Sequence, residues 1–102
     1  GVQLPQLAPE TTRASWFVYV VRLEKGINRA ETAGRLALKG IPVRPYFSPI
    51  HMHKYMAERF GCRPGDYPVT EDLSARGLAL PFSGKMTRSQ VENVCQALAS
   101  SL

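Results

Sequence analysis

The stretch Ser15–Leu23, SWFVYVVRL, carries the strongest strand signal in this sequence. Aromatic and β-branched residues, which favour strands, fill almost every position. Because apolar and polar residues barely alternate, we expect a strand that is buried on both faces. The sequence Glu24–Gly26, EKG, follows it and predicts a turn.

Residues 1–14 precede this strand and show neither a helical nor a strand period. Pro5 and Pro9 interrupt the stretch, and a polar TTR run follows them. Such a composition is typical of a connection between domains. We therefore interpret residues 1–14 as the remnant of an interdomain linker, without helix or strand, and residues 15–102 as one domain.

Helix signals follow the first strand. Asn28 and Glu31 form a variant of the capping box, so we expect a helix from there to about Lys39, ended by Gly40. Two shorter helical stretches are expected at 53–60, ended by glycine, and at 68–76. The last helix begins after Thr87, which forms a T-x-x-Q box with Gln90.

Two further strands are predicted between these helices. The segment 41–47, IPVRPYF, contains Pro42 and Pro45, and proline cannot donate to a sheet ladder, so this strand belongs at an edge. The segment 78–82, LALPF, is apolar and ends at proline. The expected fold is α+β, a small mixed or antiparallel three-stranded sheet with helices packed on one face.

Composition excludes several classes of protein. The chain has 102 residues, a net charge of +5 and 13 scattered Lys and Arg residues without a basic cluster, so we expect no nucleic acid partner. No apolar run approaches the ~20 residues of a membrane helix. The first residues lack the features of a signal peptide, and a cytoplasmic location is expected.

The cysteines and histidines do not form a metal-site pattern. Cys62 and Cys95 are expected to be free thiols, with Cys95 buried in the last helix beside Val94 and Leu98. His51 and His53 have no further ligand at a suitable spacing, so no metal is expected.

The segment 44–53, RPYFSPIHMH, is the best candidate for ligand binding. It combines an arginine that can bind phosphate or carboxylate, two aromatic rings and two histidines on a backbone stiffened by prolines. Each residue taken alone is more often structural. The concentration of such residues between secondary-structure elements favours a binding surface.

No catalytic group is predicted. The sequence contains no GxSxG, GxGxxG or P-loop motif. A Schiff-base lysine needs a desolvated pocket, and the four lysines, Lys25, Lys39, Lys54 and Lys85, all lie in polar sequence.

From Arg13 to its end the chain resembles the C-terminal small domain of DegT/StrS-type sugar aminotransferases. The residues that carry the resemblance are SWFVYVVRL at 15–23, GIPVRPYFSPIH at 40–51, GDYPVTEDLSARGLALPF at 65–82 and MTRSQVENV at 86–94. They cover about 90 residues in the family's order and spacing. Residues 1–12 resemble the linker from the large domain.

The resemblance implies an aspartate-aminotransferase fold and a homodimer. Pyridoxal 5′-phosphate (PLP) would be held by a lysine of a large domain that is absent here, so we expect none bound to these residues and no activity from them alone. The full enzyme would move an amino group from glutamate to a nucleotide-linked keto sugar, in cell-surface polysaccharide or antibiotic sugar biosynthesis.

The resemblance also implies roles for individual residues. Arg44, Tyr46, Phe47 and His51 match the segment that lines the sugar-nucleotide side of the cleft. Tyr46 and His51 are the expected contacts to the sugar or diphosphate, and Arg44 is an anion partner. Ser74 and Arg76 are interpreted as structural.

Two alternatives remain open from the sequence. One is a stand-alone module that binds sugar nucleotides without catalysis. The other is an interaction domain without a ligand, which predicts a polar surface where the large domain would dock. An exposed apolar surface would favour the aminotransferase domain instead.

Overall fold

The strand predicted at 15–23 forms β2 over its second half, Tyr19–Leu23. In the computed structural model, which describes residues 1–102, β2 pairs antiparallel with β4 (Gly77–Leu80). Tyr19 is the last paired residue, opposite Leu80. The next partner in register would be Pro81, which has no N–H to donate, so the ladder ends there.

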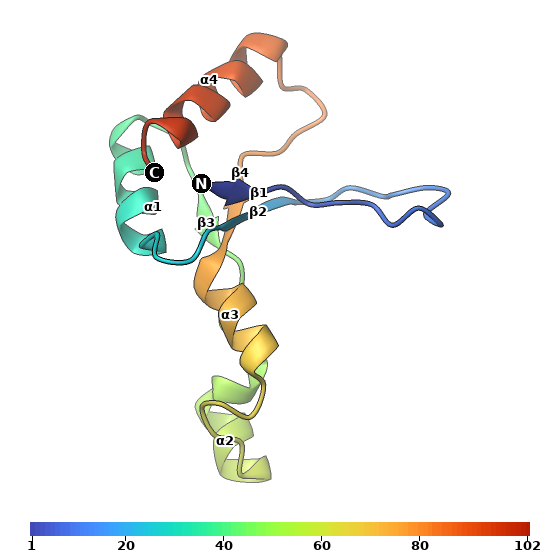
Figure 1. Ribbon diagram of the computed structural model, residues 1–102, viewed down its shortest axis with the longest axis vertical. Coiled ribbons are helices and arrows are strands. Elements are labelled where there is room, and N and C mark those ends of the chain that lie inside the picture. The colour runs from blue at the N-terminus through green and yellow to red at the C-terminus, as the bar shows by residue number, and fades with distance from the viewer.

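The sheet has four strands in the order β1-β2-β4-β3, and every pairing is antiparallel (Figure 1). The α+β class and the antiparallel sheet are confirmed. β3 (Arg44–Pro45) lies at an edge, as its prolines predict, but is shorter than the segment 41–47.

The expectation that residues 1–14 contain no strand is wrong. Val2–Gln3 form β1, which pairs with Arg22 and Leu23 at the opposite edge and raises the strand number from three to four. Two residues are too short to show a period in sequence, and only the pairing partner identifies them. The connection from β1 to β2 projects away from the rest of the molecule (Figure 1).

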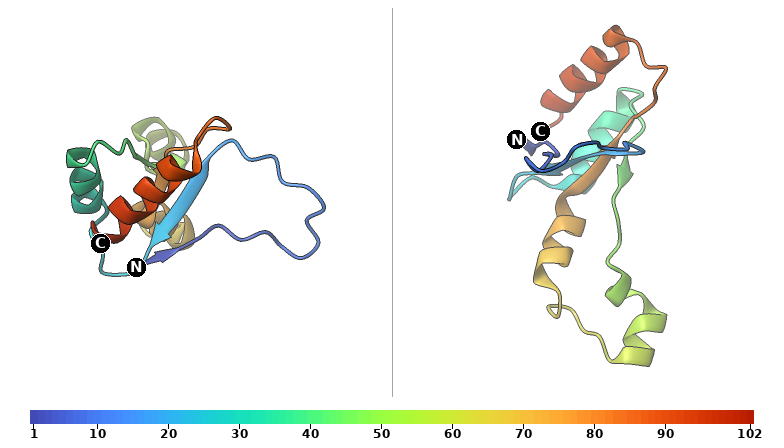
Figure 2. Two further views of the ribbon diagram at one scale, coloured as in Figure 1. Left: turned by 90° about the horizontal axis from the view of Figure 1, so that it is seen from above. Right: turned by 90° about the vertical axis from the view of Figure 1, so that its right-hand side faces the viewer.

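Helices α1 (Arg29–Leu38) and α4 (Arg88–Ala99) cover one face of the sheet (Figure 2). Both begin where their caps predict. The Asn28 side chain accepts hydrogen bonds from the backbone N–H groups of Ala30 and Glu31 at 2.9 and 3.2 Å, and Thr87 and Gln90 form a complete capping box.

The core lies between these helices and the sheet. Val21 and Leu78, which face each other across β2 and β4, both point into it. The helices and the chain after α1 contribute the remaining buried members of the cluster, Leu36, Ile41, Val94, Ala97 and Leu98. Burial of these side chains is the main source of stability in the sheet region.

The other helical elements form an arm that extends beyond the end of the sheet (Figures 1 and 2). The arm comprises η1 (Ile50–Met52), α2 (Lys54–Phe60) and α3 (Pro68–Arg76), and α3 leads directly into β4. α2 ends at Gly61, whose φ of 69° lies in the left-handed region that favours glycine. The end predicted from sequence is confirmed.

The predicted burial of Cys95 is wrong, because its side chain is exposed. α4 buries Val94, Ala97 and Leu98 against the sheet, whereas Val91 and Cys95 line an open apolar groove of about 570 Å³ between α4 and β1–β2. The apolar stripe that the sequence predicts on α4 is therefore wider than the part of the helix that packs against the sheet. None of the helices has the length and apolar character needed to cross a membrane.

Candidate functional site

The backbone of Tyr46 and Phe47 is held by the junction between α3 and β4. The N–H of Tyr46 donates to the carbonyl oxygen of Gly77 at 3.3 Å. The hydroxyl of Ser74 donates to the carbonyl oxygen of Phe47. The structural role expected for Ser74 therefore includes holding the segment that carries the candidate ligand residues.

The rings of Tyr46 and Phe47 stack on each other, with centroids 3.7 Å apart and planes inclined by 28°. Tyr46 is half-buried, whereas Phe47 is 63% exposed. An exposed aromatic face of this kind can stack against a sugar ring or a nucleobase. The two rings form the main apolar surface of the candidate site.

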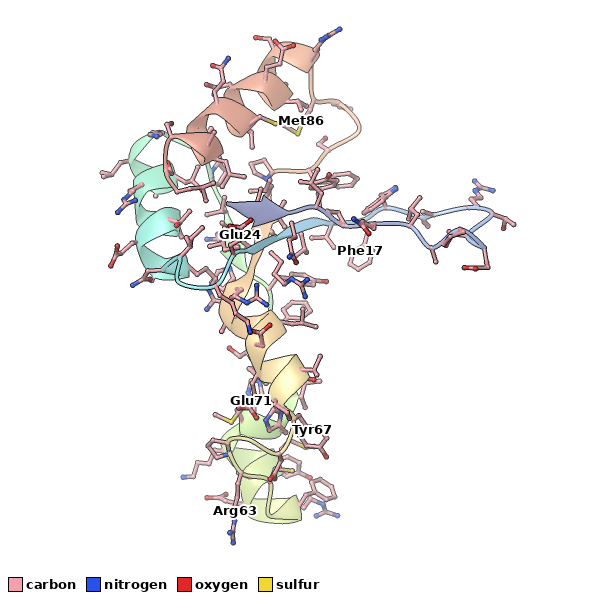
Figure 3. All side chains as sticks on the ribbon, viewed as in Figure 1. Phe17, Glu24, Arg63, Tyr67, Glu71 and Met86 are labelled. Carbon is pink, nitrogen blue, oxygen red and sulfur yellow. The ribbon has the colours of Figure 1, made fainter.

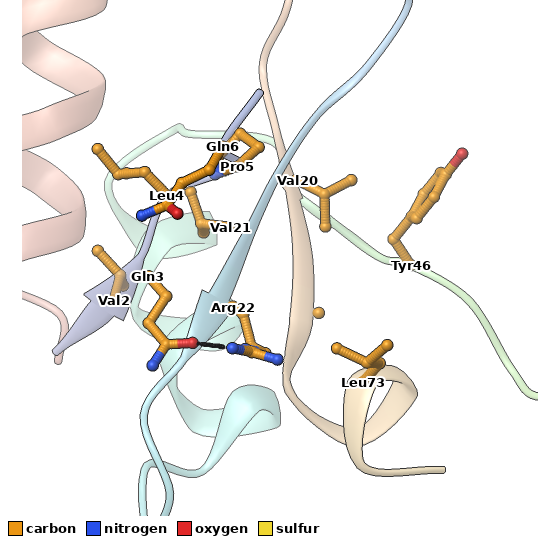
Figure 4. Close-up of a pocket in the computed structure, with 11 residues that line it drawn as sticks. Val2, Gln3, Leu4, Pro5, Gln6, Val20, Val21, Arg22, Tyr46 and Leu73 are labelled. Carbon is orange, nitrogen blue, oxygen red and sulfur yellow. Dashed lines mark hydrogen bonds between the residues drawn. The ribbon is translucent and has the colours of Figure 1, made fainter. Parts of the chain in front are cut away.

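Tyr46 lines an open cavity of about 1000 Å³ next to the sheet (Figure 4). Arg22 of β2 lies on the same cavity, with its Nε 2.7 Å from Oε1 of Gln3 on β1. The other lining residues are Val2, Leu4, Pro5, Gln6, Val20, Val21, Leu73 and Gly77. The cavity thus combines an aromatic ring, a guanidinium and two glutamine side chains.

Arg22 is not among the site residues predicted from the sequence. Arg22 lies in the apolar run of β2. Because we expected this strand to be buried on both faces, we did not assign alternate residues to opposite faces of the sheet. Val21 points into the core, so its neighbours Val20 and Arg22 point to the other face. That alternation is the sequence signal that predicts where the guanidinium lies.

Arg44 lies on the edge strand β3 opposite Ala79 and is exposed. Its guanidinium makes no hydrogen bond or ion pair within the chain, so it is free to meet an anion. It precedes the aromatic pair by two residues but does not line the cavity beside Tyr46. Of the four predicted site residues, the structure brings Tyr46 and Phe47 into contact with each other.

His51 lies in the arm and is only 8% exposed. Its Nε2 is 2.9 Å from Oε1 of Glu71, and its ring lies 4.8 Å from that of Tyr67, inclined by 55°. Figure 3 shows Glu71 and Tyr67 close together where α3 meets the rest of the arm. His51 is therefore fixed by α3.

Glu71 was not identified from the sequence because its side-chain partner, His51, lies 20 residues away along the chain. Besides His51, it accepts hydrogen bonds from the backbone N–H groups of Gly65, at 2.8 and 3.0 Å, and of Tyr67, at 3.4 Å. The Gly65 N–H, followed by the hydrogen bond with His51, lowers the pKa of this carboxyl. Glu71 is thus an anion that joins η1, the turn at 63–67 and α3.

A second ion pair fixes the far end of α3. The Arg76 guanidinium donates to both carboxylate oxygens of Asp72 and, through Nη1, to the carbonyl oxygen of Leu23 at 2.8 Å. The hydrogen bond with Arg76 lowers the pKa of Asp72 and raises that of Arg76. The structural interpretation of Arg76 agrees with these contacts.

The lysines do not fit the role of an amine that binds PLP. All four are exposed. Lys39 is further engaged, with Nζ donating to the hydroxyls of Ser100 and Ser101 at 2.6 and 2.9 Å. Since a Schiff-base lysine needs a desolvated amine, these residues offer no such group. We therefore assign no catalytic step to them.

Comparison with known proteins places this arrangement in a family. The model of the DegT/DnrJ/EryC1/StrS aminotransferase family matches residues 1–99. The spore coat polysaccharide biosynthesis protein SpsC of Bacillus subtilis is 29% identical over 90 residues, covering 84% of this chain and 23% of SpsC. The GDP-perosamine synthase of Escherichia coli O157:H7 is 28% identical over 97 residues, covering 95% of this chain and 25% of the synthase.

Solved structures agree with this match. The crystal structure of DesV from S. venezuelae, in complex with a ketimine intermediate, superposes with a TM-score of 0.84 and 28% identity, covering 98% of this chain and 26% of DesV. The chain thus spans about a quarter of the length of the relatives that it matches. The chain belongs to the DegT/DnrJ/EryC1/StrS aminotransferase family.

Proposed function

We propose that these residues form the C-terminal small domain of a PLP-dependent aminotransferase that moves an amino group from glutamate to a nucleotide-linked keto sugar. The family match over residues 1–99 is the observation that carries this proposal. The names of relatives, a GDP-perosamine synthase and a spore coat polysaccharide biosynthesis protein, support a sugar substrate. When bound, PLP supplies the amino-group transfer chemistry.

A domain of this kind needs a larger partner surface, and the distribution of apolar side chains supports one. Sixteen large hydrophobic side chains are exposed, whereas nine hydrophobic residues are buried. The exposed set includes Phe17, Ile50, Tyr55 and Val69, and the arm holds many of its members. Exposure on this scale favours docking against a large PLP-binding domain, and assembly as a homodimer, over an independent interaction domain with a polar surface.

We further propose that the domain holds the substrate and performs no chemical step. Tyr46 and Phe47 provide a stacking surface for the sugar or base, and Arg44 provides an unpaired guanidinium for the diphosphate. His51 is proposed to contact the sugar from its place in the arm. The linker assignment of residues 1–14 belongs to the same proposal, with β1 docked on the sheet.

A stand-alone module that binds sugar nucleotides without catalysis is the second candidate. The cavity shared by Arg22 and Tyr46 favours it, because binding there needs no residue outside this chain. The two functions differ in one measurable property, since only the aminotransferase converts a keto sugar.

Steady-state kinetics of the full-length protein test the proposal, with glutamate as donor and a nucleotide-linked keto sugar as acceptor. Phe47→Ala removes one stacking face worth about 0.5–1.5 kcal/mol, and we expect KM for the sugar nucleotide to rise roughly 2- to 12-fold. Phe60→Ala is the matched control, because Phe60 is equally exposed, 62% against 63%, but lies at the end of α2. Absence of glutamate-dependent amination in the wild-type protein would contradict the proposal.

A further inference from the structure

Glu71 is surrounded by hydrogen-bond donors. The backbone N–H groups of Gly65 and Tyr67 can only donate, and both point at its carboxylate. The lowered pKa of Glu71 agrees with an ionised carboxylate in this position at neutral pH. A carboxylate can only accept, so the His51 nitrogen that lies 2.9 Å from Oε1 must carry the hydrogen.

The other ring nitrogen of His51 reaches the surface. The ring makes one hydrogen bond, through Nε2. No buried side-chain nitrogen or oxygen in the chain lacks a hydrogen-bond partner, and Nδ1 has none, so Nδ1 is in contact with solvent. The Tyr67 ring packs against the imidazole and opposes a ring flip, which would put a ring carbon in place of Nε2 beside Glu71.

We propose that Glu71 is a positioning residue that fixes His51 as the Nε2–H tautomer and directs Nδ1 toward the ligand. A neutral imidazole held in this way presents a lone pair, which accepts a hydrogen bond. The ligand group that it selects is therefore a donor, such as a sugar hydroxyl. A fully ionised diphosphate, which has acceptors only, does not satisfy Nδ1. This inference rests on the proposed function, in which His51 faces the substrate.

The tautomer can be measured by ¹⁵N NMR of the full-length protein labelled at histidine. His51→Gln and His53→Gln assign the two imidazoles, and spectra are recorded at about pH 8.5, well above the ordinary histidine pKa. His53 is exposed and makes no side-chain hydrogen bond, so it serves as the internal reference. We expect His51 to populate Nε2–H more completely than His53 does.

Two variants of Glu71 separate positioning from a general loss of structure. Glu71→Gln keeps an oxygen that can accept from Nε2–H, so the wild-type tautomer ratio should persist. Glu71→Ala removes the acceptor, and the ratio of His51 should move to that of His53. If Glu71→Ala does not fold, the comparison of the tautomer ratios of His51 and His53 in the wild-type protein still tests the proposal. The proposal would be overturned if His51 in the wild-type protein had the same tautomer ratio as His53. It would also be overturned if folded Glu71→Ala left the tautomer ratio of His51 unchanged.

Titration with UDP-glucose and dTDP-glucose, each compared with UDP or dTDP alone, tests which ligand group meets Nδ1. We expect the glucosylated nucleotides to shift the Nδ1 resonance and the sugar-free nucleotides to leave it in place. An equal shift from UDP or dTDP would overturn the selection of a hydroxyl. Binding without any change at His51 would overturn its place in the cleft, which is a failure of the proposed function, while the tautomer ratio tests Glu71 separately.

Discussion

A Cβ atom on Gly77 would lie 2.6 Å from the carbonyl oxygen of Tyr46. The same glycine accepts the Tyr46 N–H through its own carbonyl at 3.3 Å. The strand that begins at Gly77 therefore approaches the candidate site more closely than any residue with a side chain would permit. Through this contact, the end of α3 determines where the aromatic pair lies.

Gly77→Ala should destabilise the protein, because its methyl group meets backbone atoms that cannot rotate away. A Cβ there would also lie 2.9 Å from the carbonyl oxygen of Leu73. We expect a loss of about 1–3 kcal/mol in the free energy of unfolding, measured by urea titration. Gly34→Ala in α1 is the control, since nothing lies within 4 Å of its Cβ, and it should stabilise by about 0.4–1 kcal/mol. Equal effects of the two variants would contradict the close approach.

The helix boundaries could be predicted from the sequence because local side chains determine them. Asn28, Thr87 and Gly61 each act within a few residues along the chain, and each acts where it was predicted. β1 and the beginning of β2 could not be predicted in the same way. The extent of each strand depends on partner strands that lie far away in sequence. The pairing of β2, for example, begins only at Tyr19, because Pro81 follows β4 on the partner side.

The candidate site, like the fold, could be predicted from the sequence only where neighbouring residues in the chain determine it. The cluster RPYFSPIH could be found from its residue types and from the resemblance to a family. Arg22 reaches the cavity from another strand, and only the alternation of faces along β2 indicates it. Glu71 could not be found from the sequence, because it contacts His51 from 20 residues away. Contacts between distant segments are a property of the fold and leave little trace in local pattern.

Thr87→Ala should weaken the start of α4. The Thr87 hydroxyl accepts the N–H of Gln90, and the Gln90 side chain accepts the N–H of Thr87 at 2.9 Å. Loss of such a cap costs about 1 kcal/mol of unfolding free energy. Thr87→Ser retains the hydroxyl and should keep most of the stability. Urea unfolding of both variants, monitored by circular dichroism, provides the comparison, and equal losses would argue against the cap.

Stability should fall in acid through Glu71 and Asp72. Both carboxyls have folded pKa values below their ordinary values of 4.5 and 3.8, so the unfolded chain binds more protons and stability rises with pH in this range. Their contribution is complete above about pH 4.5 and is lost as the pH falls through the folded pKa values. Unfolding titrations between pH 3 and pH 7 should show this dependence.

Glu71→Gln and Asp72→Asn test the assignment of this acid dependence. Each variant removes one titrating carboxyl, so its difference in stability from the wild type should be largest at neutral pH and should shrink as the pH falls. A difference that stays constant from pH 7 to pH 3 would show that the carboxyl does not titrate with a shifted pKa. Glu31→Gln is a suitable control, because its carboxylate is exposed on the surface of α1, 3.5 Å from the Arg35 guanidinium.

Residues 44–51 are proposed to hold the substrate of a sugar aminotransferase, and amide chemical shifts test this most directly. The full-length protein is titrated with UDP-glucose and dTDP-glucose while backbone amides are followed by NMR. We predict saturable shifts concentrated on residues 44–51, with smaller changes in the exposed segment around Phe60. Saturable binding with no shift in residues 44–51 would contradict the account.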